Sequence, residues 1–293
     1  MKNQEERNLV EKIMHFPITK IVIGIITCIL TTYLVKAFIT TPLLSLLIPS
    51  ETIVKTIVAL IGTIVMTATY YYLFKYYEKR QITELSFKHA FKELFGGFGF
   101  GILVIGAEFL ILYFLGNYEI TGYDKNFTLF SASLAFLIGA AMLEEIIFRG
   151  VLYRILENWK GTVIAVLISG VIFQIPHFMN PNESIIGAIA GMLFGMLMGI
   201  MYTYTRRLWL PFSFHLGWNL AQPIFGSNLT GLDQFGVFFN AEFQGSTLLT
   251  GSAMGIEDSL LTLGSLVILL ILFYKASLRK KHVIPRLVKS KKV

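Results

Sequence analysis

Long stretches of this chain are apolar on every side, not only on one face. Residues 21–35, IVIGIITCILTTYLV, show neither the period of an amphipathic helix nor that of a half-buried strand. A run of about 20 apolar residues is long enough for a helix to cross a bilayer. The pattern predicts eight transmembrane helices, near residues 18–39, 53–76, 94–116, 128–155, 161–178, 184–205, 208–226 and 256–275.

The composition agrees with this interpretation. Of the 293 residues, 55% are hydrophobic and only 15% are charged, which excludes an ordinary soluble domain. The predicted fold class is therefore all-α, a polytopic membrane bundle of about eight transmembrane helices that forms a single membrane domain over residues 1–293. Cys28 is the only cysteine, so the chain has no intrachain disulfide and no cysteine metal cluster.

Basic residues alternate between the predicted loops. The net charge of +7 lies mostly in two short terminal segments beside apolar helices, which predicts contact with membrane lipid and no nucleic acid partner. With a cytoplasmic N-terminus, most lysines and arginines share the inner side, including the basic tail 276–293, and only Lys36, Lys55 and Lys125 fall outside or near the outer face. We expect a multi-pass protein with both termini cytoplasmic, a retained first helix and no removed signal peptide.

Two further segments predict architecture. Residues 227–255 form the longest connection and contain no lysine or arginine, so they are expected to be an outer loop that serves as a plain connector, with substrate gating as the alternative. The stripe Gly187, Gly191, Gly195 and Gly199 has the spacing of small residues at close helix contacts. We expect this stripe to pack inside the same chain; a homodimer face is the alternative.

Four polar residues fall at one depth in the apolar helices. Glu144 and His177 are equally far, about 20 to 25 Å, from a helical turn expected at Lys160 and Gly161. His215 and Asn219 are four residues apart on one face of another helix and reach the same layer. A single intramembrane histidine usually serves packing, but ionisable residues that converge in a membrane indicate function.

A second glutamate follows Glu144 directly. Glu145 precedes Arg149 by four residues, which is the favourable order for an ion pair on a helix. This pair would neutralise Glu145 and leave Glu144 free for chemistry. Glu108 has no such companion in the sequence, and we expect it to form hydrogen bonds to a neighbouring helix.

The same residues carry a resemblance to a known family. Glu144-Glu145-x-x-x-Arg149, Phe173-x-x-x-His177 and His215-x-x-x-Asn219 resemble, in order and spacing, the three motifs of the type II CAAX prenyl protease family, also called the CPBP or Abi family. The resemblance implies an intramembrane endopeptidase with a protease core at about residues 128–226. It also implies a peptide or protein substrate.

The resemblance implies a role for each residue. Glu144 and His177 would activate water, His215 and Asn219 would donate hydrogen bonds to the oxyanion, and Glu145 and Arg149 would give structural support. This glutamic protease mechanism needs no metal or other cofactor. One glutamate with two histidines is also a ligand set for catalytic zinc, and this alternative stays open.

Two other classes of function compete with proteolysis. The first is a non-catalytic membrane immunity or scaffold protein that retains the protease fold. The second is a small proton-coupled carrier with Glu108, Glu144 and His177 as a relay, although the inverted repeats typical of carriers are not evident. Bacterial members of the family are linked to bacteriocin maturation or immunity, and the short basic tail would suit a bacterial plasma membrane.

Overall fold

The computed structural model describes residues 9–124 and 128–286 of this chain. The described part is mostly helical and is that of a multi-pass integral membrane protein. Six helices are long and apolar enough to cross a bilayer: Pro17–Leu47, Glu51–Tyr77, Ala90–Phe114, Thr162–Met179, Ile185–Thr205 and Leu260–Arg279. Lys125 and residues 287–293 of the expected basic tail lie outside the described residues.

The elements from Pro17 onward follow one another with short connections at the ends of the helices. In chain order they are α2 (Pro17–Val35), the π-helical η1 (Lys36–Thr40), α3 (Thr41–Leu47), α4 (Glu51–Tyr77), the 3-10 segment η2 (Thr83–Leu85), α5 (Ala90–Phe114), β1 (Tyr118–Tyr123), α6 (Thr128–Glu144), the π-helical η3 (Glu145–Tyr153), α7 (Arg154–Lys160), α8 (Thr162–Gln174), the 3-10 segment η4 (Ile175–Met179), α9 (Ile185–Thr205), α10 (Trp209–Ile224), β2 (Phe239–Phe243), α11 (Thr247–Thr250), the 3-10 segment η5 (Ile256–Asp258) and α12 (Leu260–Arg279).

The remaining two of the eight expected spans are the helices that carry most of the motif residues. The fourth runs without a break through α6, η3 and α7, so it reaches Lys160 and not residue 155. The seventh is α10, which has 16 residues and is shorter than the other spans. Six helices thus match expected spans, and these two have the expected place in the chain.

Two boundaries differ from expectation for local reasons. The helix expected over 161–178 changes to 3-10 geometry after Gln174, because Pro176 cannot donate the next α-helical hydrogen bond. The last helix starts at Leu260 and not at 256. There the Ser259 side chain accepts a hydrogen bond from the Thr262 backbone N–H and caps the helix.

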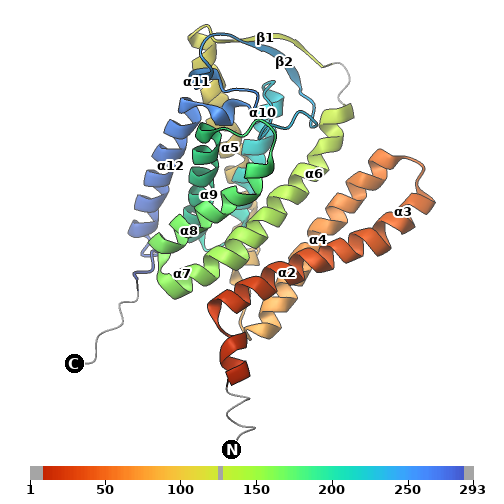
Figure 1. Cartoon of the computed structure of the whole chain (residues 1–293), viewed down its shortest axis with the longest axis vertical. Coiled ribbons are helices and arrows are strands. Elements are labelled where there is room, and N and C mark those ends of the chain that lie inside the picture. The colour runs from red at the N-terminus through yellow and green to blue at the C-terminus, as the bar shows by residue number, and fades with distance from the viewer. Residues whose placement is uncertain (1–8, 125–127, 287–293) are drawn as a thin grey trace, which may run out of the picture.

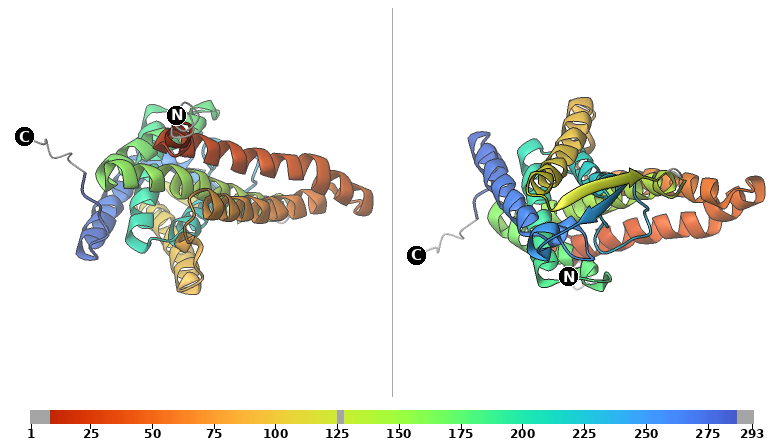
Figure 2. Two further views of the ribbon diagram at one scale, coloured as in Figure 1. Left: turned by 90° about the horizontal axis from the view of Figure 1, so that it is seen from below. Right: turned by 90° about the horizontal axis from the view of Figure 1, so that it is seen from above.

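Figure 1 shows how these helices are arranged. The sheet lies at one end of the molecule, and the start of α2 and the end of α12 both lie at the other end, the terminal end. The hairpin of α2, α3 and α4 extends to one side of the bundle, as both views in Figure 2 show. Inside the bundle α10 packs against α5, α6 and α9, and α9 packs against α8 and α12. The motif-bearing helices are therefore surrounded by other helices.

The structure contains a sheet that the all-α prediction omitted. β1 and β2 pair in antiparallel fashion, and Tyr118 lies opposite Phe243. This sheet ties the α5–α6 connection to the long loop 227–255. The loop is also more than a connector, because Leu229, Thr230 and Phe235 line the central cavity.

Glycines set the closest helix contacts. A Cβ atom on Gly101 of α5 would lie 2.4 Å from the Phe214 carbonyl oxygen of α10, and one on Gly217 would lie 2.2 Å from the Phe98 carbonyl oxygen. The backbones of α5 and α10 therefore touch. The predicted stripe on α9 also packs inside the chain, as expected: Gly191 faces Gln174, Gly195 faces Phe173 and Gly199 faces Tyr153.

Both terminal segments pack on the turn between α7 and α8. Phe16 makes an edge contact with Trp159, with ring centroids 5.6 Å apart. On the other side the Thr162 backbone N–H donates to the Ile284 carbonyl oxygen at 3.0 Å, and the Ile284 N–H donates to the Thr162 hydroxyl at 2.8 Å. The two ends of the described chain are thus fixed to one end of the bundle.

Candidate active site

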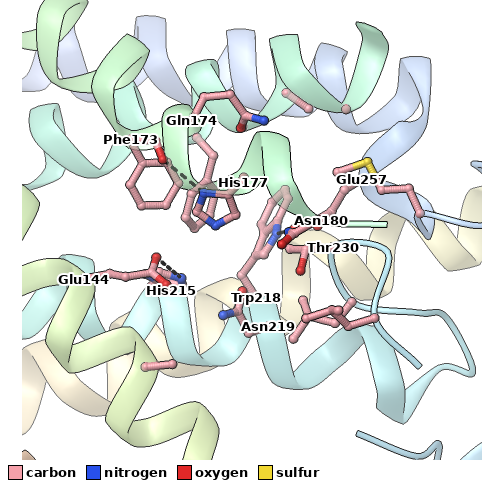
Figure 3. A pocket seen from close by; sticks show the side chains of 18 of the residues that line it. Glu144, Phe173, Gln174, His177, Asn180, His215, Trp218, Asn219, Thr230 and Glu257 are labelled. Atoms are coloured by element: carbon pink, nitrogen blue, oxygen red, sulfur yellow. Dashed lines mark hydrogen bonds and ion pairs between the residues drawn. The ribbon is translucent and has the colours of Figure 1, made fainter. Parts of the chain in front are cut away.

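A cavity of about 280 Å³ lies between the helices, toward the sheet end. Its walls come from α6, α8, η4, α9, α10 and α12 and from the connections before β2 and α12. Glu144, His177, His215 and Asn219 all line it, so the structure brings together the four residues that the sequence placed at one depth. Figure 3 shows Glu144 and His215 on one side of this cavity and Glu257 on the other.

The two adjacent glutamates stand where the helix widens. Glu144 is the last residue of α6, and Glu145 is the first residue of the nine-residue π-helix η3. π-helical turns are rare in proteins, and many of those that occur lie at functional sites. Glu144 faces the cavity with 24% of its side chain exposed, whereas the Glu145 side chain is completely buried. The two carboxylates therefore have different environments.

Glu145 joins Arg149 to His215. Arg149 Nη1 lies 2.9 Å from Glu145 Oε1, which is the predicted ion pair, and its Nη2 donates to the Gly195 carbonyl oxygen at 3.1 Å. His215 Nδ1 is also 2.9 Å from Glu145 Oε1, a contact that the sequence did not predict. Because a carboxylate only accepts, Nδ1 carries the proton and Nε2 turns to Glu144 Oε2, 3.8 Å away.

His177 is held by the turn that Pro176 creates. It lies on η4 and not on the α-helix, and its Nδ1 is 3.0 Å from the Phe173 carbonyl oxygen. A carbonyl oxygen only accepts, so Nδ1 donates and the neutral ring keeps a lone pair on Nε2. In Figure 3 this second nitrogen is turned toward the side where Glu144 and His215 lie.

Asn219 lies one turn beyond His215 on α10 and also lines the cavity. Between them Trp218 is almost fully buried against Phe194 and Phe214, with ring centroids 5.3 and 5.9 Å away. This packing fixes the rotation of α10. The rotation in turn points both His215 and Asn219 into the cavity.

The residues in this arrangement do not make a metal site. Within residues 9–124 and 128–286, no three histidine, cysteine, aspartate or glutamate side chains are grouped so that they would hold a metal ion. The zinc alternative therefore finds no support in the geometry of these side chains.

Glu108 has the structural role expected for it. Thr262 and Ser265 of α12 both donate hydrogen bonds to its carboxylate, and Glu108 does not line the cavity. It therefore bonds across to a neighbouring helix. The proton relay that would have joined it to Glu144 and His177 gains no support from this contact.

Several cavity residues were not predicted. Glu257 receives hydrogen bonds from Trp218 Nε1 at 2.9 Å and from Gln222 Nε2 at 3.0 Å. Near it, burial raises the pKa of the Glu183 carboxyl; Glu257 and Asp258 act in the same direction, and His177 opposes them. The contact between α10 and Glu257 had one signal in the sequence. This signal was Trp218, between His215 and Asn219, because a buried indole N–H needs an acceptor.

The fold and the site together define a polytopic helical membrane protein with a polar cavity enclosed by its helices. Residues 126–221 match the family model described as type II CAAX prenyl endopeptidase Rce1-like, so this part of the chain is similar to that family. The match contains all three motifs and confirms the family recognised from them. No curated protein and no solved structure matches the chain.

Proposed function

We propose that this protein is an intramembrane endopeptidase that hydrolyses a peptide bond of a membrane-associated peptide or protein. One observation carries the proposal: Glu144, His177, His215 and Asn219 converge on one cavity. It is supported by the match to a family of CAAX prenyl endopeptidases over residues 126–221. The reaction needs an activated water, donors for the oxyanion and a proton for the leaving amine.

Glu144 is the general base in this mechanism. Its carboxylate and the Nε2 atom of His177 both accept hydrogen bonds. A water molecule held between them donates both of its protons and turns an oxygen lone pair to the substrate carbonyl carbon. As the new C–O bond forms, Glu144 takes one proton from the water and the carbonyl electron pair moves onto its oxygen.

His215 and Asn219 stabilise that oxyanion. Because Glu145 engages the Nδ1–H of His215, a donor role for Nε2 requires a ring protonated on both nitrogens. Glu145, which is held by Arg149, fixes the His215 ring in the orientation that turns Nε2 toward Glu144. Glu145 and Arg149 are thus positioning residues, which act through His215.

Collapse of the tetrahedral intermediate completes the reaction. The C–N bond breaks, its electron pair goes to nitrogen, and the proton held by Glu144 is transferred to this nitrogen. The products are a new carboxyl terminus and a free amine. Glu144 returns to its ionised form.

Replacing Glu144 with Gln tests the proposal. Glu144→Gln keeps the size of the side chain and removes the base, so we expect normal abundance and loss of hydrolysis by about 100-fold or more. Mass spectrometry of membrane and secreted peptides from cells that produce either form measures the loss. The matched control is Glu108→Gln, which removes a carboxylate outside the cavity.

The outcome also separates the alternatives. Biological function that survives Glu144→Gln would favour the non-catalytic immunity or scaffold protein. Cleavage that stops on addition of a chelator and returns with zinc would favour the metal mechanism. Either result would contradict the metal-free hydrolase proposed here.

We further propose that the terminal end faces the cytoplasm of a bacterial plasma membrane. Arg80 and Arg154 form ion pairs with Glu78 at the end of α4. Arg206 donates to the His282 carbonyl oxygen just after α12, and Arg207 pairs with Glu93 in the first turn of α5. An excess of basic residues on the inner side is the usual orientation signal. The sheet then lies toward the outer face.

A further inference from the structure

The cavity contains a carboxylate that the proposed mechanism does not use. Glu257 lies at the end of the cavity opposite Glu144 (Figure 3). Trp218 Nε1–H and Gln222 Nε2–H both donate to its Oε1 atom. No side chain in the described part of the chain donates a hydrogen bond to Oε2. This oxygen therefore stays available to a ligand.

Glu257 is partly buried and has no cationic partner within the described part of the protein, unlike several of the buried glutamates. Arg80, Arg149, Arg206 and Arg207 each form an ion pair with a buried glutamate, and Thr262 and Ser265 hold Glu108. Among the residues described, no lysine or arginine forms an ion pair with Glu257 or lines the cavity. A carboxylate in such surroundings is costly without a cation, so the cation is expected from the ligand.

The charge of the sheet end favours the same ligand. The connections 115–127, 175–184 and 225–259 contain one lysine, Lys125, and no arginine. They contain the acidic residues Glu119, Asp124, Glu183, Asp233, Glu242, Glu257 and Asp258. An acidic rim around a cavity attracts and concentrates positively charged ligands.

From these observations we propose that Glu257, fixed by Trp218, binds a lysine or arginine side chain of the substrate peptide. This inference rests on the proposed function, whose substrate class it narrows to peptides with a basic residue near the cleaved bond. Trp218 holds the Glu257 carboxylate in place, and the free carboxylate oxygen receives the charged group of the substrate.

The helix that joins the two sites sets their separation. Trp218 and Gln222 follow His215 by three and seven residues on α10, which places Glu257 about 5 to 10 Å along the helix axis from the reaction site. An extended peptide advances about 3.3 Å per residue. The basic residue is therefore expected within about one to three positions of the cleaved bond.

The test profiles cleavage by the purified full-length protein in lipid nanodiscs. The probe is a pool of proteome-derived peptides that retain internal lysine and arginine, with the cut bonds identified by mass spectrometry. We expect lysine or arginine at one fixed position to be enriched about tenfold, the size of one hydrogen bond to a charged group. Glu257→Gln should abolish this enrichment, and Glu257→Lys should replace it with a preference for acidic residues.

Glu257→Gln is a mild change because the amide oxygen still accepts from Trp218 and Gln222. The matched control is Glu242→Gln, which removes an exposed carboxylate on β2 and should leave the preference intact. Cleavage that depends on Glu144 but shows no basic preference, or keeps it in Glu257→Gln, would overturn the inference and leave the proposed function standing.

Identical profiles for the wild type and Glu144→Gln would instead overturn the proposed function. In that case, a measurement of peptide binding tests the inference about Glu257. A fluorescent apolar peptide with one central lysine should bind the wild type about tenfold more tightly than its norleucine counterpart, and equally in Glu257→Gln. Equal binding of the two peptides to the wild type would refute the cation site.

Discussion

At the scale of single residues, the site depends on one fully buried arginine. Arg149 balances Glu145, which in turn holds His215, so three side chains form one charged unit. The guanidinium also lies over the Phe173 ring, 4.6 Å from its centroid. A change at Arg149 therefore reaches the proposed oxyanion donor without touching substrate.

Arg149→Met is expected to destabilise the protein by about 3 to 5 kcal/mol, because it leaves the Glu145 carboxylate buried without a cation. Thermal unfolding of the purified protein in one detergent measures this. The double variant Arg149→Met with Glu145→Gln should regain much of the stability but not the hydrolysis, since His215 loses its carboxylate. As a control, Lys55→Met opens the exposed pair with Glu51 and should leave the midpoint unchanged. An unfolding midpoint of Arg149→Met equal to that of the wild type would contradict a stabilising role of the buried ion pair.

The sequence predicted this unit only in part. The spacing of Glu145 and Arg149 was sufficient for their ion pair, because both lie on one helix. The contact of Glu145 with His215 and that of Glu257 with Trp218 join residues 70 and 39 positions apart. Such contacts depend on the rotation of α10 against its neighbours, which the periodicity of an evenly apolar helix does not encode.

At the scale of elements, the contact of α5 with α10 positions the site. Gly101 and Gly217 allow the two backbones to touch, and α10 carries His215, Trp218 and Asn219. Neither glycine belongs to the motifs. The precision of the cavity wall therefore depends on a helix that contributes no side chain to it.

Gly101→Ala or Gly217→Ala is expected to destabilise the protein by about 1 to 3 kcal/mol and to reduce hydrolysis, because the added methyl group meets backbone atoms. Gly99→Ala on the same helix is the control, since its Cβ would have no neighbour within 4 Å. Unfolding midpoints and cleavage rates of the three variants measure the effect. Identical behaviour at positions 99 and 101 would show that α5 and α10 do not pack this closely.

A charge network at the terminal end joins α2, α4 and α7. Burial acts to raise the pKa of the Glu78 carboxyl, but Arg154, Arg80 and Lys20 outweigh it and lower the pKa below its usual range. Since the folded-state pKa lies below the unfolded one, this stabilisation is present at neutral pH. It is lost as the pH falls through the folded-state value.

Glu78→Gln should therefore lower the unfolding midpoint at about pH 7. The effect should shrink as the pH falls through the lowered folded-state pKa of Glu78, where the wild type also loses the charge. A midpoint shift of about 2 to 4 °C corresponds to each kcal/mol lost in a protein of this size class. Unfolding curves at several pH values measure the difference. A constant difference over this range would mean that the Glu78 charge does not contribute.

At the scale of the whole molecule, the order of the apolar helices and six of the eight expected spans followed from the sequence, because bilayer thickness fixes their length. The sheet did not: β1 and β2 are short, and only their pairing over more than a hundred residues makes them strands. The wall that loop 227–255 adds to the cavity likewise arises from tertiary contacts and not from composition. The orientation of the protein in the membrane is predicted only from the unequal distribution of basic residues between its two ends.

Labelling of single cysteines tests this orientation. In a Cys28→Ser background, a membrane-impermeant maleimide should label Glu242→Cys in intact cells and Lys12→Cys only after permeabilisation, because β2 and the start of the chain lie at opposite ends. Cys28 itself is fully buried, so the background change removes only a silent thiol. The reverse labelling pattern would place the cavity toward the cytoplasm.

The segment around Ile284 sets a limit on how this protein can be shortened or tagged. Its carbonyl oxygen accepts from the Thr162 backbone N–H and its own N–H donates to the Thr162 hydroxyl, so it braces the turn between α7 and α8, the helix that leads to His177. A truncation before Ile284 would remove a brace far from the chemistry, whereas an affinity tag placed after the last residue leaves it in place. A shortened form of the protein, for example for crystallisation, should therefore retain Ile284 and lose only residues that follow it.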